Sequence, residues 1–262
     1  SSAASDVYKR QDWVSIGIFT ACIIFPVSIL LDGSLTKIER DRIFVIYIIA
    51  FFVIFFWAAY EQAGASLTLF AAEQTDRTIL GWEMPASWIQ SFNPFFVVIL
   101  AAIMPSVWGA LNKRGMEPAS PTKQAIGLLL LSLGYLVICF GVKDVQPGIK
   151  VSLIWLTGLY FIHTMGEIAL SPIGLSMVNK LTPVRFASLM MGIWYLSTST
   201  ANKFAGTLGG LYPEDGKVKT LLGFRIETMF DFFMVFVIMS GVASLILFLL
   251  SKKLQKMMHG VE

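Results

Sequence analysis

The sequence predicts an all-α polytopic membrane protein. Hydrophobic residues occupy 56% of its 262 positions and charged residues only 14%, against about 25% in a typical soluble domain. The apolar residues gather in stretches long enough for helices that cross a hydrocarbon core about 30 Å thick. A formal net charge of +3, without a basic tract or alternating basic and aromatic residues, argues against a nucleic-acid partner. The expected surroundings are therefore a lipid bilayer.

Seven apolar stretches predict seven membrane spans. Residues 1–12 are polar and without periodicity, which predicts a linker or a cut end. One span, 13–31, is separated by a short linker, 32–42, from a group of six within 43–251, and a basic tail, 252–262, follows. The six are 43–72, 85–111, 124–142, 151–180, 186–212 and 229–251. The first of these is about 30 residues long, or roughly 45 Å as one helix, so it must tilt or project from the bilayer.

Lysine and arginine are distributed unequally between the two sets of alternating loops. The set that includes the C-terminal tail holds eleven of them and the opposite set holds eight. Because cytoplasmic loops carry the excess of basic residues, this count predicts a cytoplasmic C-terminus.

The span VSLIWLTGLYFIHTMGEIALSPIGLSMVNK, 151–180, carries Glu167 near its middle. A carboxylate at membrane depth is costly and is rarely left facing lipid. Polar and small residues recur around it at steps of three and four, which places them on one helix face: Tyr160, His163, Glu167, Ser171 and Gly174. Pro172 interrupts the backbone hydrogen bonds and predicts a kink. The pattern predicts a substrate-binding helix that lines a cavity.

Two further spans carry polar residues at membrane depth. Glu61 follows aromatic residues in FFWAAYEQAG, which suits a carboxyl group that gains and loses a proton, although permanent pairing with a basic residue of another helix is the alternative. Asn93 precedes Pro94 in SFNPFF, so its amide either reads polar ends of a substrate or caps carbonyls that the proline frees. In the span 186–212, Trp194 lies too deep to anchor the helix at the membrane surface and is expected to face the cavity.

His163 and Glu167 are four residues apart, a spacing that can bring two metal ligands together. A hydrogen-bonding or packing histidine is the preferred interpretation, because the sequence has no HExxH pattern and no third ligand near them. We therefore expect no metal and no enzyme. An intramembrane enzyme that uses this pair would lack a nucleophile.

Four stretches together resemble the C-terminal half of proton-dependent oligopeptide transporters, the peptide branch of the major facilitator superfamily. They are FFWAAYEQAG, SFNPFF, GEIALSPIGLS and ASLMMGIWYLSTSTANKFAG, in the order of that family. The resemblance implies that 43–251 is the C-terminal six-helix bundle of a major-facilitator fold. It also implies that 13–31 is an extra transmembrane helix of the kind that bacterial members insert between their halves, in a bacterial cytoplasmic membrane.

The resemblance also implies roles for individual residues. Glu61 would take part in proton coupling, with the proton as the coupling ion and no other cofactor. Glu167 would hold the α-ammonium group of a di- or tripeptide, with Ser171 one turn away, and Asn93 would contact the peptide backbone or terminus. The remaining pocket residues would be aromatic: Trp57, Tyr60 and Trp194.

The motifs of the N-terminal half of that family, an ExxER motif among them, are missing from this sequence. The group that would receive the peptide carboxylate is therefore expected on an N-terminal six-helix half outside the chain. The implied function is proton-coupled import of di- and tripeptides by alternating access. Transport of another small zwitterionic or anionic solute remains the nearest alternative, and a membrane scaffold that transports nothing is the alternative from another class.

Overall fold

The computed structural model describes residues 2–143, 145, 148–214 and 217–261, and helices dominate it. The α-helices are α1 (Ser2–Leu30), α2 (Lys37–Tyr60), α3 (Ser66–Glu73), α4 (Phe92–Lys113), α5 (Ser120–Val142), α6 (Leu153–Leu181), α7 (Ala187–Gly209) and α8 (Met229–Met257). Three 3₁₀ turns are η1 (Glu61–Gly64), η2 (Ala86–Ser91) and η3 (Val184–Phe186). The short strands are β1 (Thr75–Asp76), β2 (Thr78–Ile79), β3 (Trp82–Glu83), β4 (Val151–Ser152), β5 (Lys219–Leu221) and β6 (Phe224–Ile226).

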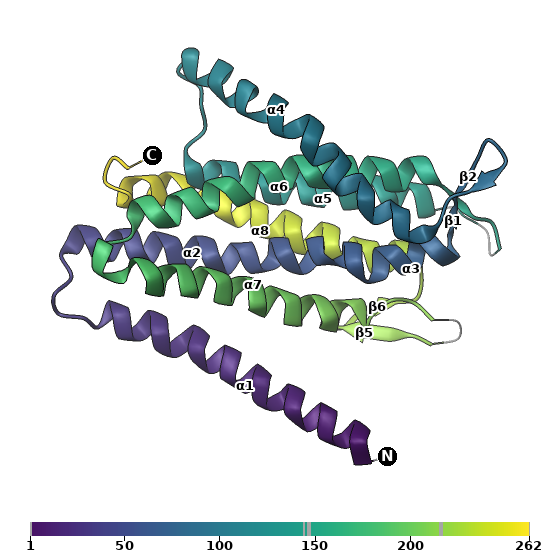
Figure 1. Cartoon of the computed structure of the whole chain (residues 1–262), viewed down its shortest axis with the longest axis horizontal. Coiled ribbons are helices and arrows are strands. Elements are labelled where there is room, and N and C mark those ends of the chain that lie inside the picture. The colour runs from purple at the N-terminus through teal and green to yellow at the C-terminus, as the bar shows by residue number, and fades with distance from the viewer. Residues whose placement is uncertain (1, 144, 146–147, 215–216, 262) are drawn as a thin grey trace.

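The helices form a bundle with two peripheral members (Figure 1). Helices α2, α5, α6, α7 and α8 run side by side, α1 lies obliquely along α7, and α4 crosses α6 and then diverges from it (Figure 1). The strands make three two-stranded pairs, parallel between β1 and β4 and antiparallel in β2–β3 and β5–β6. All three pairs gather at the end of the bundle opposite the C-terminus (Figure 1).

Six helical segments of the described chain are long and apolar enough to cross a membrane. They are Trp13–Leu30, Lys37–Glu73, Ala86–Lys113, Ser120–Val142, Leu153–Leu181 and Met229–Met257. The remaining expected span, 186–212, forms α7, which packs between α1 and α2 but is more polar than the others. Its polarity comes from the run STSTANK at 197–203. The chain is thus an all-α polytopic membrane protein, as predicted.

The first helix begins earlier than the sequence pattern indicated. Residues 1–12 were expected to be a linker or a cut end, and α1 is helical from Ser2 onward. The reason is that extending an existing helix costs far less than nucleating one, and the segment contains good helix formers such as alanine, lysine, arginine and glutamine.

The span expected as one helix over 43–72 is interrupted. Helix α2 ends at Tyr60, the 3₁₀ turn η1 follows, and α3 begins at Ser66. Buried Gln62 hydrogen-bonds to backbone on both sides of this interface: its amide nitrogen donates to the carbonyl oxygens of Ala58 in α2, at 3.2 Å, and of Ala205 in α7, at 2.9 Å. Irregular backbone at membrane depth is tolerated where such partners satisfy it. The interruption places Tyr60 and Glu61 at a helix end within the span Lys37–Glu73.

Helices α5 and α6 approach each other closely because glycines line their contact. A Cβ atom on Gly127 would lie 2.8 Å from Cβ of Leu170, and one on Gly166 would lie 2.9 Å from the carbonyl oxygen of Gly127. A Cβ atom on Gly134 would overlap the ring of His163. Small residues at such contacts let membrane helices gain van der Waals packing. Helix α6 is thereby held firmly in the bundle.

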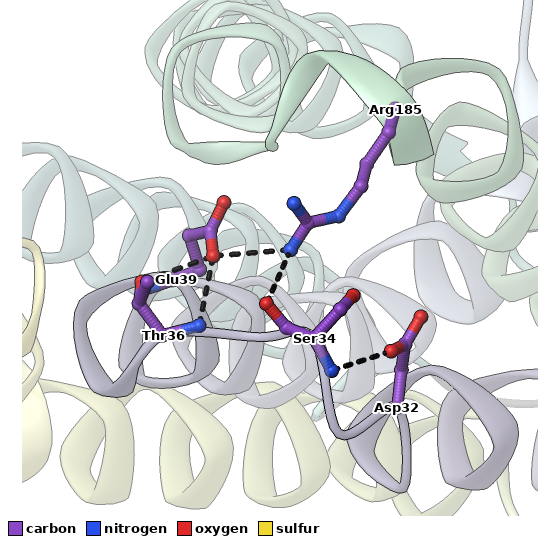
Figure 2. A network of polar contacts seen from close by, with 5 residues as sticks. All are labelled: Asp32, Ser34, Thr36, Glu39 and Arg185. Atoms are coloured by element: carbon purple, nitrogen blue, oxygen red, sulfur yellow. Dashed lines mark hydrogen bonds and ion pairs between the residues drawn. The ribbon is translucent and has the colours of Figure 1, made fainter.

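Polar contacts join the loops at the C-terminal end of the bundle (Figure 2). Arg185, in η3, donates to the carboxylate of Glu39 at 3.1 Å and to the carbonyl oxygen of Ser34 at 3.2 Å. Thr36 and Glu39 form a capping box at the start of α2. Hydrogen bonds from the side chain and backbone of Ser34 lower the pKa of the Asp32 carboxyl. The network ties the linker between α1 and α2 to the connection between α6 and α7.

Candidate functional site

Three helices bring their polar residues together around Glu167. The Tyr60 hydroxyl, at the end of α2, donates to Oε2 of Glu167 at 2.5 Å. The amide nitrogen of Asn93, in the first turn of α4, lies 2.9 Å from the same oxygen and also contacts the Tyr60 hydroxyl. We call Tyr60, Asn93 and Glu167 the carboxylate cluster. Because their helices are far apart in sequence, the cluster exists only in the folded bundle.

Aromatic packing holds Tyr60 in place. Its ring stacks on Phe56 with centroids 5.5 Å apart and planes 16° from parallel. The edge of Trp57 meets the same ring at 5.4 Å. Trp57 and Tyr60, both expected to line a pocket, are therefore neighbours, and Tyr60 is the one that contacts Glu167.

The amide of Asn93 contacts other side chains. In addition to Tyr60 and Glu167, its Nδ2 atom lies 3.2 Å from Oγ1 of Thr164. Pro94 lies in the first turn of α4, where a missing N–H leaves no intrahelical bond unmade. Within the described residues the Asn93 amide contacts side chains and no backbone carbonyl, which argues against the carbonyl cap. That Asn93 reads the polar ends of a substrate stays a prediction.

Glu61 is exposed and begins η1, one residue after Tyr60. None of the ion pairs within the described residues includes Glu61. The permanent ion pair that was the alternative interpretation is thus not formed within this part of the chain.

The polar face predicted for α6 is divided among several neighbours. Glu167 faces α2 and α4, whereas the His163 ring is buried against α5, with Nε2 3.1 Å from the carbonyl oxygen of Leu131. Gly174 packs against Trp194 of α7 and Gln124 of α5. An inner helix has partners on most sides, so residues three and four positions apart need not share one. His163 therefore packs and hydrogen-bonds, as preferred from the sequence.

Two of the predicted site residues lie outside the carboxylate cluster. Ser171 is half-buried one turn beyond Glu167. Trp194 is 4% exposed, and its ring lies where a side chain on Gly174 would be. Over the residues that the structure describes, no group of three or more histidine, cysteine, aspartate or glutamate side chains could hold a metal ion.

Sequence reasoning missed three residues that support the site. Thr164 accepts from Asn93, and its position three residues before Glu167 was a usable helical signal. Gln62 and Gln124 act on backbone groups: Gln124 is buried and donates to the carbonyl oxygen of Leu170 at 2.9 Å, two residues before the predicted kink at Pro172. No periodicity marks such glutamines, because their partners lie on other helices.

Comparison with known proteins gives the chain relatives over most of its length. A family profile described as the POT family matches residues 4–222. The peptide transporter YePEPT of Yersinia enterocolitica is 37% identical over 185 residues, which cover 70% of this chain and 36% of that protein. Dipeptide and tripeptide permease A of Escherichia coli is 30% identical over 218 residues, 83% of this chain and 43% of the permease. These relatives are transporters, not enzymes.

Solved structures agree with the sequence relatives. A peptide transporter POT in complex with sulfate superimposes with a TM-score of 0.84 at 29% identity, over 97% of this chain and 49% of that one. A POT family transporter in complex with 5-aminolevulinic acid gives a TM-score of 0.80 at 26% identity, over 93% and 48%.

The matches cover most of this chain but only part of each related protein. The chain spans about half the length of the solved transporters and between 36% and 48% of the first three curated relatives. The profile match and the identities confirm the resemblance predicted from the sequence. The chain belongs to the POT family.

Proposed function

We propose that this chain is the C-terminal half of a proton-coupled transporter that imports di- and tripeptides by alternating access. Its partner would be an N-terminal six-helix half, and both would lie in a bacterial cytoplasmic membrane. The names of the relatives, which include a dipeptide and tripeptide permease, support the substrate class. The share of the solved transporters that the chain covers supports the division into halves.

The state of Glu167 is the observation that carries the proposal. The carboxylate is half-buried among three helices, and none of the ion pairs within the described chain supplies a countercharge. A bound α-ammonium group would supply both the missing charge and hydrogen-bond donors. Charge pairs of this kind are stronger where water is limited than in bulk solvent. Glu167 is therefore proposed to bind the peptide N-terminus, with Asn93 and Trp57 beside it and Ser171 one turn away.

Glu167→Gln in the full-length transporter tests this role. Removing one partner of a buried charge pair costs about 2–5 kcal/mol, roughly 30-fold to several-thousand-fold in affinity. The variant should therefore bind an unmodified dipeptide far more weakly, but its already weak binding of the N-acetylated dipeptide should hardly change. Glu227→Gln, at an exposed glutamate that pairs with Arg225, is the matched control. Equal weakening of both ligands in Glu167→Gln would refute the ammonium site.

Glu61 is proposed to carry the coupling proton. It is exposed and directly follows Tyr60, whose hydroxyl contacts Glu167, so protonation would change the charge near the substrate site. Glu61→Gln keeps the shape and hydrogen-bonding capacity but cannot titrate. The variant should lose proton-driven accumulation of peptide and retain exchange of peptide across the membrane. Concentrative uptake at the wild-type level would exclude Glu61 from coupling.

The C-terminus is proposed to be cytoplasmic, on the distribution of lysine and arginine. A cysteine at Lys217, in the loop before β5, should react with an impermeant thiol reagent added to intact cells. A cysteine at Lys253, near the end of α8, should react only after the cells are opened. The reverse pattern would invert the proposed orientation.

Another small zwitterionic solute is the second candidate substrate. One solved relative holds 5-aminolevulinic acid, which has an amine and a carboxylate but no peptide bond. Glu167 would serve any such ammonium group. Competition between that compound and a dipeptide for uptake, each with and without Glu167→Gln, separates the two candidates.

A further inference from the structure

The two oxygens of the Glu167 carboxylate have unequal surroundings. Oε2 receives both donors of the carboxylate cluster, the Tyr60 hydroxyl at 2.5 Å and the Asn93 amide at 2.9 Å. Oε1 receives no hydrogen bond from any residue in the described ranges. The carboxylate is therefore held by one oxygen, and the other is left for a further donor.

The groups that hold Oε2 are themselves fixed by the protein. Tyr60 stacks on Phe56 and meets the edge of Trp57, so its ring is positioned by its own helix. Asn93 is also placed by Oγ1 of Thr164, whose hydroxyl donates to the carbonyl oxygen of Tyr160 at 2.7 Å. The arrangement of donors thus exists before any substrate binds.

We infer that Tyr60 is a positioning residue: its hydroxyl orients the Glu167 carboxylate so that Oε1 is the oxygen offered to the ammonium group of the substrate. This inference rests on the proposed role of Glu167. It assigns Tyr60 a task different from lining the pocket. A pocket wall contributes to the binding of every ligand, whereas an orienting hydroxyl contributes only where Glu167 has an ammonium group to meet.

The size of the effect follows from the cost of ordering the carboxylate. The last torsion of a glutamate side chain is broad, so an unheld carboxylate samples many orientations. A group that is already held loses less freedom when the ligand arrives. Losing one hydrogen bond of ordinary net strength corresponds to about threefold to tenfold in affinity.

Tyr60→Phe in the full-length transporter tests the inference, because phenylalanine keeps the ring and removes only the hydroxyl. The quantity measured is the ratio of dissociation constants for the N-acetylated and the unmodified dipeptide. This ratio isolates recognition of the ammonium group, since a general change in the pocket alters both constants. We expect the ratio to fall about threefold to tenfold. In a Glu167→Gln background, Tyr60→Phe should leave the ratio unchanged.

Tyr47→Phe is the matched control. Tyr47 is on the same helix, but its hydroxyl contacts Sδ of Met190 in α7, at 3.6 Å, and the ratio should keep its wild-type value. If Tyr60→Phe leaves the ratio unchanged or weakens both ligands equally, the inference is wrong, while the result for Glu167→Gln still decides the proposed function. If Glu167→Gln itself preserves the ratio, the ammonium site and the inference fall together.

Discussion

Helices α5 and α4 both have the composition of a membrane span, yet they are packed in opposite ways. Helix α5 buries thirteen residues and lies against α6 and α8, whereas α4 buries two, Leu100 and Met104. Both helices serve the same region, because α5 packs against the helix that carries Glu167 and α4 supplies Asn93. The comparison shows that the carboxylate cluster joins the closely packed part of the bundle to a helix that packs mainly along α6.

The largest difference between the two helices is expected in the unfolding free energy that is lost when a buried leucine is shortened to alanine. Leu128, on α5, is fully buried, and Leu128→Ala should cost about 2–5 kcal/mol of unfolding free energy because the close-packed neighbours cannot fill the cavity. Leu100→Ala should lie at the low end of this range, about 2 kcal/mol, because its small cluster borders the surface and can collapse. Unfolding of the full-length protein in mixed micelles measures both, with exposed Val98→Ala on α4 as the control. Equal costs would mean that α4 is as firmly packed as α5.

Replacing a glycine by alanine at a crowded and at an open position should give a smaller difference in stability. Gly134→Ala puts a Cβ atom into the space of the His163 ring, so it should lower stability by about 1–3 kcal/mol. Gly192→Ala, on α7, meets nothing within 4 Å and should be neutral or stabilise by up to about 1 kcal/mol, because alanine favours the helix. The same unfolding measurement applies. A neutral Gly134→Ala would show that α5 and α6 separate readily.

The sequence predicted the fold where hydrophobicity decides it and failed where side chains replace backbone contacts. Apolar length located six of the expected spans to within several residues, and the seventh, 186–212, forms α7, which is not among the segments apolar enough to cross a membrane. The break after Tyr60 was not predicted, because EQAG contains no proline and Gln62 stabilises the turn through a carbonyl on α7. The helical start of α1 was missed because a polar segment can extend a helix that begins elsewhere.

The carboxylate cluster was predicted as a set of residues but not as an arrangement. Tyr60, Asn93 and Glu167 were each selected from their own stretch, and the fold brings them together. No pattern within one stretch indicates that two donors share a single oxygen, because that depends on how three helices cross. Trp194 illustrates the converse: its depth was read from the sequence, but its burial against Gly174 depends on a contact between two helices.

The bond between Gln62 and Ala205 has a mechanical consequence. The turn that carries Glu61 is fastened to the backbone of α7, and Ser66 fastens the other end of the Gln62 amide at 2.6 Å. If the turn were displaced, either α7 would move with it or the hydrogen bond between Gln62 and Ala205 would break. α1 lies along α7 and would be carried with it (Figure 1). The η1 turn and α7 are thus joined by a buried hydrogen bond between a side chain and the backbone.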